Sequence, residues 1–196
     1  VAVVFLAGTL ACQYLLNAVG EQRITERARR MMRPLSLLFL AAFLSFLGAL
    51  LVSTGWSYDA SGVVAAEPYK YLHNLLQMPL VSVVMLIGVV LVLASILLGW
   101  RGSRKAIWLG GSGTVLTVLA LLLCAGWNNT AYYPSLVDMQ SSLTIANSSS
   151  SEFTLRVMAY VSLLIPFVLA YIWYAWRSLN RHPVTSEELR DEEHSY

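Results

Sequence analysis

The sequence predicts an all-α integral membrane protein, a bundle of five transmembrane helices. The chain is 57% hydrophobic and only 12% charged, whereas about a quarter of the residues in a soluble domain are charged. Five long apolar stretches reach or approach the roughly 20 residues with which a helix crosses the hydrocarbon core. If these stretches cross the membrane in turn, all of the thirteen basic residues except Lys70 and Arg156 fall on one side.

The predicted spans have no Asp, Glu, Lys or Arg in their interiors, whereas a helix at the surface of a soluble protein carries a polar face. They are residues 1–19, 35–54, 77–100, 106–127 and 154–177. Residues 1–177 therefore form the predicted bundle, and residues 178–196 form a polar tail. The six tryptophans lie near the ends of spans, as in the aromatic belts of membrane proteins.

The basic residues predict the orientation of the bundle. Eleven of them share one side: Arg23, Arg27, Arg29, Arg30, Arg33, Arg101, Arg104, Lys105, Arg177, Arg181 and Arg190. By the positive-inside rule this side is cytoplasmic, so the chain starts outside and its C-terminus is cytoplasmic. These residues are interpreted as anchors at the membrane surface, and no nucleic-acid partner is expected.

The first span begins at Val1, with neither an initiator Met nor the basic start of a signal peptide. We therefore expect the chain to begin inside a larger protein. The following connection, residues 20–34, is interpreted as a solvated amphipathic segment. In it, Glu26 and Arg30 have the i,i+4 spacing of a helical ion pair.

The second span carries small residues at every fourth position, namely Ala41, Ser45, Ala49 and Ser53. Rows of this kind let helix backbones approach closely in a bilayer, where packing drives helix association. They predict a packing seam, either within this chain or against a partner subunit. The alternative is a chance register, because small residues are common in such helices.

The remaining spans carry their own markers. An outer loop, residues 55–76, precedes Pro79, which suits a first helical turn. The fourth span opens with Gly110-Gly111-Ser112-Gly113, a pattern that favours close helix contact. A second outer loop follows over residues 128–153. In the last span, Pro166 predicts a kink because it donates no backbone hydrogen bond.

A serine-rich stretch, residues 141–158, precedes the last span. Ser149 and Glu152 have the S-x-x-E spacing of a capping box, in which the hydroxyl and the carboxylate each bind a backbone N–H. The stretch also has the form S-S-L-T-I-x-N-x-S-S-S-x-x-T-L. Its members include Ser141, Ser142, Thr144 and Asn147.

This form resembles the last extracytoplasmic loop and final helix of subunit II of cytochrome bd-type quinol oxidases. Gly20-Glu21, followed by Arg27-Ala28-Arg29, is similar to a cytoplasmic turn of the same family. The resemblance implies the C-terminal part of a subunit with about nine spans, located in the bacterial inner (plasma) membrane. It further implies a non-haem scaffold of a respiratory quinol:oxygen oxidoreductase. Haems b and d are expected in the partner, subunit I, and the other partners are the lipid bilayer and a quinone.

No residue of this chain is assigned to catalysis, to a cofactor or to a metal. Ionisable groups deep in a membrane are functional candidates, and the span interiors contain none. His73 is interpreted as an ordinary interfacial histidine rather than a haem ligand. Cys12 and Cys124 fall at different depths, which argues against a disulfide. No residue is assigned to the quinone.

Two other functions stay open. A small transporter or channel-like protein would need polar residues at mid-depth or broken helices in paired repeats, and Pro166 supplies only one break. A self-contained membrane enzyme would need a catalytic constellation, which the motifs do not provide.

Overall fold

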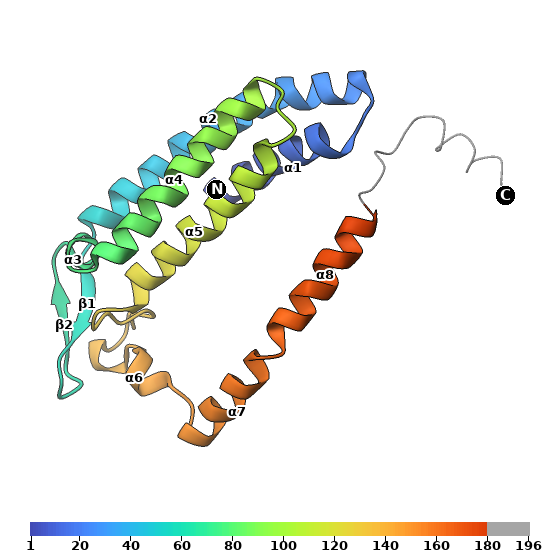
Figure 1. The fold of residues 1–196 in the computed structure, drawn as a ribbon. Coiled ribbons are helices and arrows are strands. Elements are labelled where there is room, and N and C mark those ends of the chain that lie inside the picture. Colours follow the sequence, from blue (N-terminus) through green and yellow to red (C-terminus); the bar gives the residue numbers. More distant parts are fainter. Residues whose placement is uncertain (180–196) are drawn as a thin grey trace.

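The computed structural model describes residues 1–179 and has three parts (Figure 1). A bundle contains α1 (Ala2–Ala18), α2 (Gln22–Val52), α4 (Pro79–Trp100) and α5 (Ala106–Gly126). At one end lies a polar cap built from β1 (Gly55–Tyr58), β2 (Val64–Glu67), α3 (Lys70–Gln77) and residues 127–151. A C-terminal arm comprises α7 (Glu152–Ser162) and α8 (Ile165–Leu179). Arg181, Arg190 and nearly all of the predicted tail lie outside the described residues.

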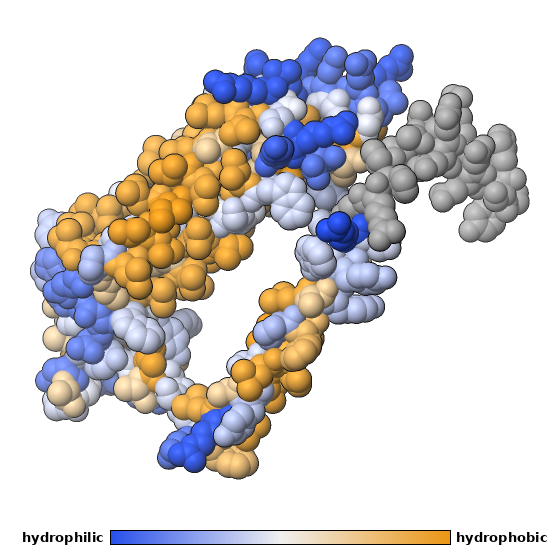
Figure 2. Space-filling view, viewed as in Figure 1, coloured by the Kyte–Doolittle hydropathy of each residue, from blue (hydrophilic) through white to orange (hydrophobic). Residues whose placement is uncertain are grey.

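Hydrophobic residues form a continuous band over the bundle, with polar residues at both ends (Figure 2). Within the described residues, four helical segments are long and apolar enough to cross a membrane: Gln22–Val52, Pro79–Trp100, Ala106–Gly126 and Glu152–Ser178. The apolar helix α1 has 17 residues and is shorter than these. The chain is therefore a helical membrane protein.

Helix α2 is longer than predicted, because the connection at residues 20–34 is itself helical. Its Arg, Glu and Gln residues are good helix formers, and the helix continues through Pro34. The predicted pairing of Glu26 with Arg30 was wrong. Over residues 1–179 the ion pairs join Glu67 to Lys70 and His73, and Glu152 to Arg156.

Glycines bring α4 and α5 together at the centre of the bundle. A Cβ added to Gly113 would lie 2.8 Å from the backbone oxygen of Gly88, and one added to Gly88 would lie 2.7 Å from the backbone nitrogen of Thr117. The close contact predicted for the glycine-rich start of the fourth span is confirmed for Gly113. At Gly111 an added Cβ would meet nothing within 4 Å.

The polar cap contains a β-hairpin, so an all-α fold was too narrow a prediction. Strands β1 and β2 pair antiparallel, from Gly55 opposite Glu67 to Tyr58 opposite Val64. Between them, the Asp59 carboxylate accepts hydrogen bonds of 2.9 Å from the backbone N–H groups of Ser61 and Val63. Gly62 has φ +82°, a conformation that glycine adopts at little cost.

The arm is broken where the sequence predicts it. Helix α7 ends at Ser162 and α8 begins at Ile165, one residue before Pro166. Proline has no backbone N–H, so Pro166 cannot donate a hydrogen bond to the carbonyl of Ser162. No residue in the apolar window of the arm is buried. Figure 2 shows open space between the arm and the bundle. Near the end of α8 the rings of Tyr14 and Trp176 meet edge to face, 6.1 Å apart.

Candidate functional site

The cap is organised around one buried amide. Asn74 of α3 is fully buried, and its Nδ2 donates to the Cys124 carbonyl at 2.8 Å and to Thr130 Oγ1 at 2.7 Å. Its Oδ1 accepts from Asn128 Nδ2 at 3.0 Å. One side chain thus joins α3, the end of α5 and the chain that follows α5.

That chain reverses at Asn128 and Asn129, both of which have positive φ, at 55° and 54°. Asparagine tolerates this left-handed conformation better than most residues. After the reversal, Ala131 N–H donates to the Trp56 carbonyl at 2.8 Å, so the segment lies along β1. The Gln140 side chain borders β2 similarly, accepting from Val64 N–H at 2.9 Å and donating to its carbonyl at 2.8 Å.

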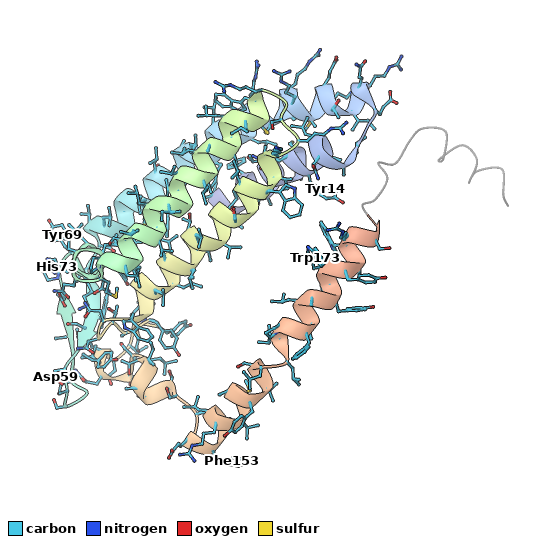
Figure 3. The ribbon with its side chains drawn as sticks, viewed as in Figure 1. Tyr14, Asp59, Tyr69, His73, Phe153 and Trp173 are labelled. Carbon is cyan, nitrogen blue, oxygen red and sulfur yellow. The ribbon has the colours of Figure 1, made fainter. Side chains whose placement is uncertain are left out.

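A charged cluster lies beside this amide network. The Glu67 carboxylate contacts Lys70 Nζ and His73 Nδ1, each at 2.9 Å. The hydrogen bond from His73, followed by the interaction with Lys70, lowers the pKa of Glu67 below its ordinary value. Lys70 is only 5% exposed, and its stem packs against Gly55, where an added Cβ would lie 2.7 Å from Lys70 Cβ. Figure 3 places His73 at this end of the bundle, close to Tyr69.

Inside the apolar band there is one fully buried amide, which the sequence analysis missed. Gln13 of α1 is 0% exposed, and its Nε2 donates to Ser95 Oγ of α4 at 3.2 Å. Its Oε1 has no hydrogen-bond partner and rests on α5, since a Cβ on Gly110 would come within 2.5 Å of it. Polar side chains hold helices together in membranes, and a Gln in an apolar span was the available signal.

An apolar groove of about 440 Å³ lies between all four helices of the bundle. Phe39 and Phe43 of α2 stack along it with ring centroids 5.7 Å apart. Only Thr114 and Thr117 bring hydroxyl groups to its lining, and both hydroxyls donate to backbone carbonyls of α5. The groove offers shape and apolar surface but no group for acid–base or nucleophilic chemistry.

The serine-rich motif is brought together in the polar cap, but the residues that cap its helices differ from the predicted ones. Thr144 and Asn147 form the capping box of α6 (Ile145–Ser148): Thr144 N–H donates to Asn147 Oδ1 at 2.7 Å and Asn147 N–H to Thr144 Oγ1 at 3.2 Å. Ser142 is buried and accepts from Ser135 N–H at 3.0 Å. Ser141 lies in the 3-10 helix η1 (Met139–Ser141), where its hydroxyl bonds Asp138.

The predicted capping box of Ser149 and Glu152 was wrong. Helix α7 begins two residues later than that box requires, so Ser151 is its N-cap and accepts from Thr154 N–H at 3.4 Å. The Ser149 hydroxyl instead donates to the carbonyl of Ile145. Glu152 pairs with Arg156 at 2.6 Å.

The predicted seam lies on the surface of the bundle. Ala41, Ser45 and Ala49 are exposed and Ser53 is partly exposed, so none of the four is buried against a helix within the described chain. The thiols of Cys12 and Cys124 are free and buried. Residues 1–179 contain no group of three or more His, Cys, Asp or Glu side chains placed to hold a metal ion.

Comparison with known proteins points to one family. A family model described as cytochrome bd terminal oxidase subunit II matches residues 1–179. The chain is also similar to the cytochrome bd-I ubiquinol oxidase subunit 2 of Escherichia coli K12, and to the proteins of the same name in strains O6:H1 and O157:H7. Each is 30% identical over 201 residues, covering 95% of this chain and 52% of the relative. The chain thus spans about half the length of the curated relatives it matches.

Proposed function

Because this chain belongs to the cytochrome bd terminal oxidase subunit II family, we propose that it is a non-haem part of a respiratory quinol:oxygen oxidoreductase. In this proposal it corresponds to the C-terminal part of the subunit, and α1, α2, α4, α5 and the arm are its five spans. It lies in the bacterial inner membrane with the polar cap outside and the C-terminus in the cytoplasm. Haems b and d are bound by a partner subunit, which carries out the redox chemistry with the quinone.

The role that this chain plays is that of a scaffold for the haem-bearing subunit. The observation that carries this role is the arm, an apolar helical segment with no buried residue in its membrane-spanning window. Lipid tails are as apolar as the side chains of membrane helices, so the hydrophobic effect does not drive these helices together. They associate through close packing and interhelical hydrogen bonds. The exposed row of Ala41, Ser45 and Ala49 on α2 provides a surface for such packing. The space beside the arm provides room for helices of the partner (Figure 2).

The buried Gln13 gives no support to the alternative of a transporter. Its amide is enclosed between Ser95 and Gly110, and the groove beside α2 is lined almost wholly by apolar residues. A transport path needs polar groups that face a route through the membrane.

The experiment is to purify the native full-length protein gently from its own membranes through a C-terminal tag. We expect a larger subunit to co-purify and the reduced-minus-oxidised spectrum to contain b-type and d-type haem bands. A colourless protein without a partner, obtained in good yield, would contradict the proposal.

A substitution in the seam tests the scaffold role separately. Ala49→Leu places a bulky side chain on the close-packing row, so we expect less haem per purified chain. The control is Gly111→Leu, at a position where an added Cβ meets nothing within 4 Å, and its haem content should stay normal. Wild-type haem content in the Ala49→Leu complex would exclude the seam as a contact with the haem-bearing subunit.

A further inference from the structure

The end of the bundle opposite the cap carries a group of cations that the scaffold role does not use. Arg29, Arg30 and Arg33 of α2, together with Glu26, line a shallow hollow of about 410 Å³. With 3.6 residues per turn, these four positions fall within one arc of about 100° on the helix. Within residues 1–179 none of the three arginines forms an ion pair, so the group has excess positive charge toward solvent.

One of these arginines is held in place by the neighbouring helix. Arg29 Nε donates to the backbone carbonyl of Trp100 at 2.7 Å, while the indole N–H of Trp100 donates to Ser36 Oγ at 3.1 Å. The guanidinium lies over the α4–α5 turn, where a Cβ on Gly102 would be 3.7 Å from Arg29 Nη1. Its orientation is therefore set before a ligand arrives, and its side chain is still exposed.

Directly beyond the arginines, the surface of α2 becomes apolar. No charged residue follows Arg33 before the end of the helix at Val52, a stretch of about 28 Å at 1.5 Å per residue, which matches the hydrocarbon core of a bilayer. Leu37 and Leu44 fall within the same arc as the arginines and are 55% and 63% exposed. The arginines thus lie at the depth of lipid headgroups, and the leucines lie at the depth of acyl chains.

We propose that Arg29, Arg30 and Arg33 bind the phosphate headgroup of an anionic phospholipid, whose acyl chain lies against Leu37 and Leu44. Guanidinium groups bind phosphate oxygens through paired hydrogen bonds. Basic pockets at the membrane surface bind anionic headgroups in the same way. The apolar track decides in favour of a lipid over a soluble anion, because a free phosphate ion would gain nothing from the leucines.

The test uses the protein purified in detergent from its own membranes, stripped of lipid and titrated with phosphatidylglycerol, with bound lipid counted by native mass spectrometry. The variant is Arg30→Gln/Arg33→Gln, which alters two exposed side chains. At about fivefold per basic residue, its affinity for phosphatidylglycerol should fall about 25-fold. Its affinity for phosphatidylcholine with the same acyl chains should be unchanged. The matched control, Arg156→Gln on α7, should bind phosphatidylglycerol as the wild type does.

Several results would overturn the proposal. One is an unchanged affinity of Arg30→Gln/Arg33→Gln, and another is an equal loss in Arg156→Gln. Inorganic phosphate that binds the wild type as tightly as phosphatidylglycerol would reveal an anion site without lipid selectivity. If the double variant does not elute as a single species in size-exclusion chromatography, a measurement on the wild type alone still tests the proposal. Its affinity for phosphatidylglycerol should weaken steeply as ionic strength rises, and an affinity independent of salt would exclude the arginines as ligands.

Discussion

At the scale of single residues, the cap depends on Asn74. In Asn74→Leu, the Cys124 carbonyl, Thr130 hydroxyl and Asn128 amide each lose a hydrogen bond. A buried polar group left without its partner costs about 1–3 kcal/mol, so we expect the free energy of unfolding to fall by roughly 2–4 kcal/mol. Denaturant unfolding in detergent, followed by tryptophan fluorescence, measures this change.

The control for that change is Leu76→Ala in the same helix, where the side chain is 73% exposed. It should unfold close to the wild-type midpoint. If Asn74→Leu also unfolds at that midpoint, the amide network contributes nothing to the stability of the cap.

A second residue-scale prediction concerns pH. The pKa of Glu67 is lowered from 4.5 by its contacts with His73 and Lys70, so its ionised form is favoured in the folded state. The stabilisation is complete above pH 4.5 and is lost as the pH falls through the lower, folded-state pKa. The difference in unfolding free energy between the wild type and Glu67→Gln should therefore be present at pH 5 and shrink as the pH falls below 4.5.

Glu152→Gln provides the comparison, because the Glu152 carboxylate is 80% exposed in its pair with Arg156 and exposed pairs contribute little. Its difference from the wild type should be near zero throughout. A Glu67→Gln difference that persists undiminished at acid pH would show that the carboxylate is not the source of the stabilisation.

At the scale of elements, the α4–α5 contact makes a sharp prediction. In Gly113→Ala, the added methyl group would lie 2.8 Å from Gly88 O and Val92 N. These are backbone atoms, so the two helices must move apart. Overpacking of this kind typically costs 1–3 kcal/mol, and the thermal unfolding midpoint in detergent should drop.

Gly111→Ala is the matched change two residues away, with open space at its Cβ. It should be neutral or slightly stabilising, because alanine favours a helix over glycine. Equal effects of the two substitutions would show that helix propensity, and not the helix–helix contact, decides stability here.

The long apolar helices could be predicted from the sequence because a bilayer allows few alternatives to a helix. Outside the bilayer that constraint disappears, and there the sequence predicted loops without their strands and helices. The hairpin was missed because its strands have only four residues each, and the signal was the turn at Asp59–Gly62. The sequence predicted an amphipathic connector at residues 20–34 but not its continuation into the second span as one helix, because Pro34 lies at the junction.

For the serine-rich motif, the sequence predicted which residues cap helices in general, but not which residue caps which helix. The hydroxyl-rich motif does cap helices, but α6 and α7 begin within a few residues of each other. Which hydroxyl caps which helix depends on where each helix starts, and the sequence pattern does not fix this. Gln13 was missed because its burial depends on Ser95 and Gly110, two residues far away in the sequence.

At the scale of the whole molecule, the arm approaches the bundle again through Tyr14 and Trp176. In Figure 3, Tyr14 lies on the side of the bundle that faces the arm. A variant with cysteines at these two positions, in a background with Cys12 and Cys124 replaced by alanine, should be joined efficiently by a short bismaleimide. The cross-link is detected by mass spectrometry of the digested protein.

The companion variant carries its cysteines at Tyr14 and Phe153, where Figure 3 shows the second residue at the far end of the arm. It should give no cross-link within one chain. A cross-link there, with none at Tyr14 and Trp176, would require a different position of the arm.

The exposure of the arm also has a consequence for biogenesis. Because α7 and α8 follow the bundle in the sequence, they leave the ribosome after the bundle does. The bundle can therefore fold before the arm is inserted, and in the proposed complex the haem-bearing subunit can enter beside the bundle before Tyr14 and Trp176 meet. Under the proposed function, a newly made copy that meets no partner subunit keeps the arm, broken near Pro166, exposed to lipid. In that proposal, removal of copies with an uncovered arm would keep the two subunits in equal numbers.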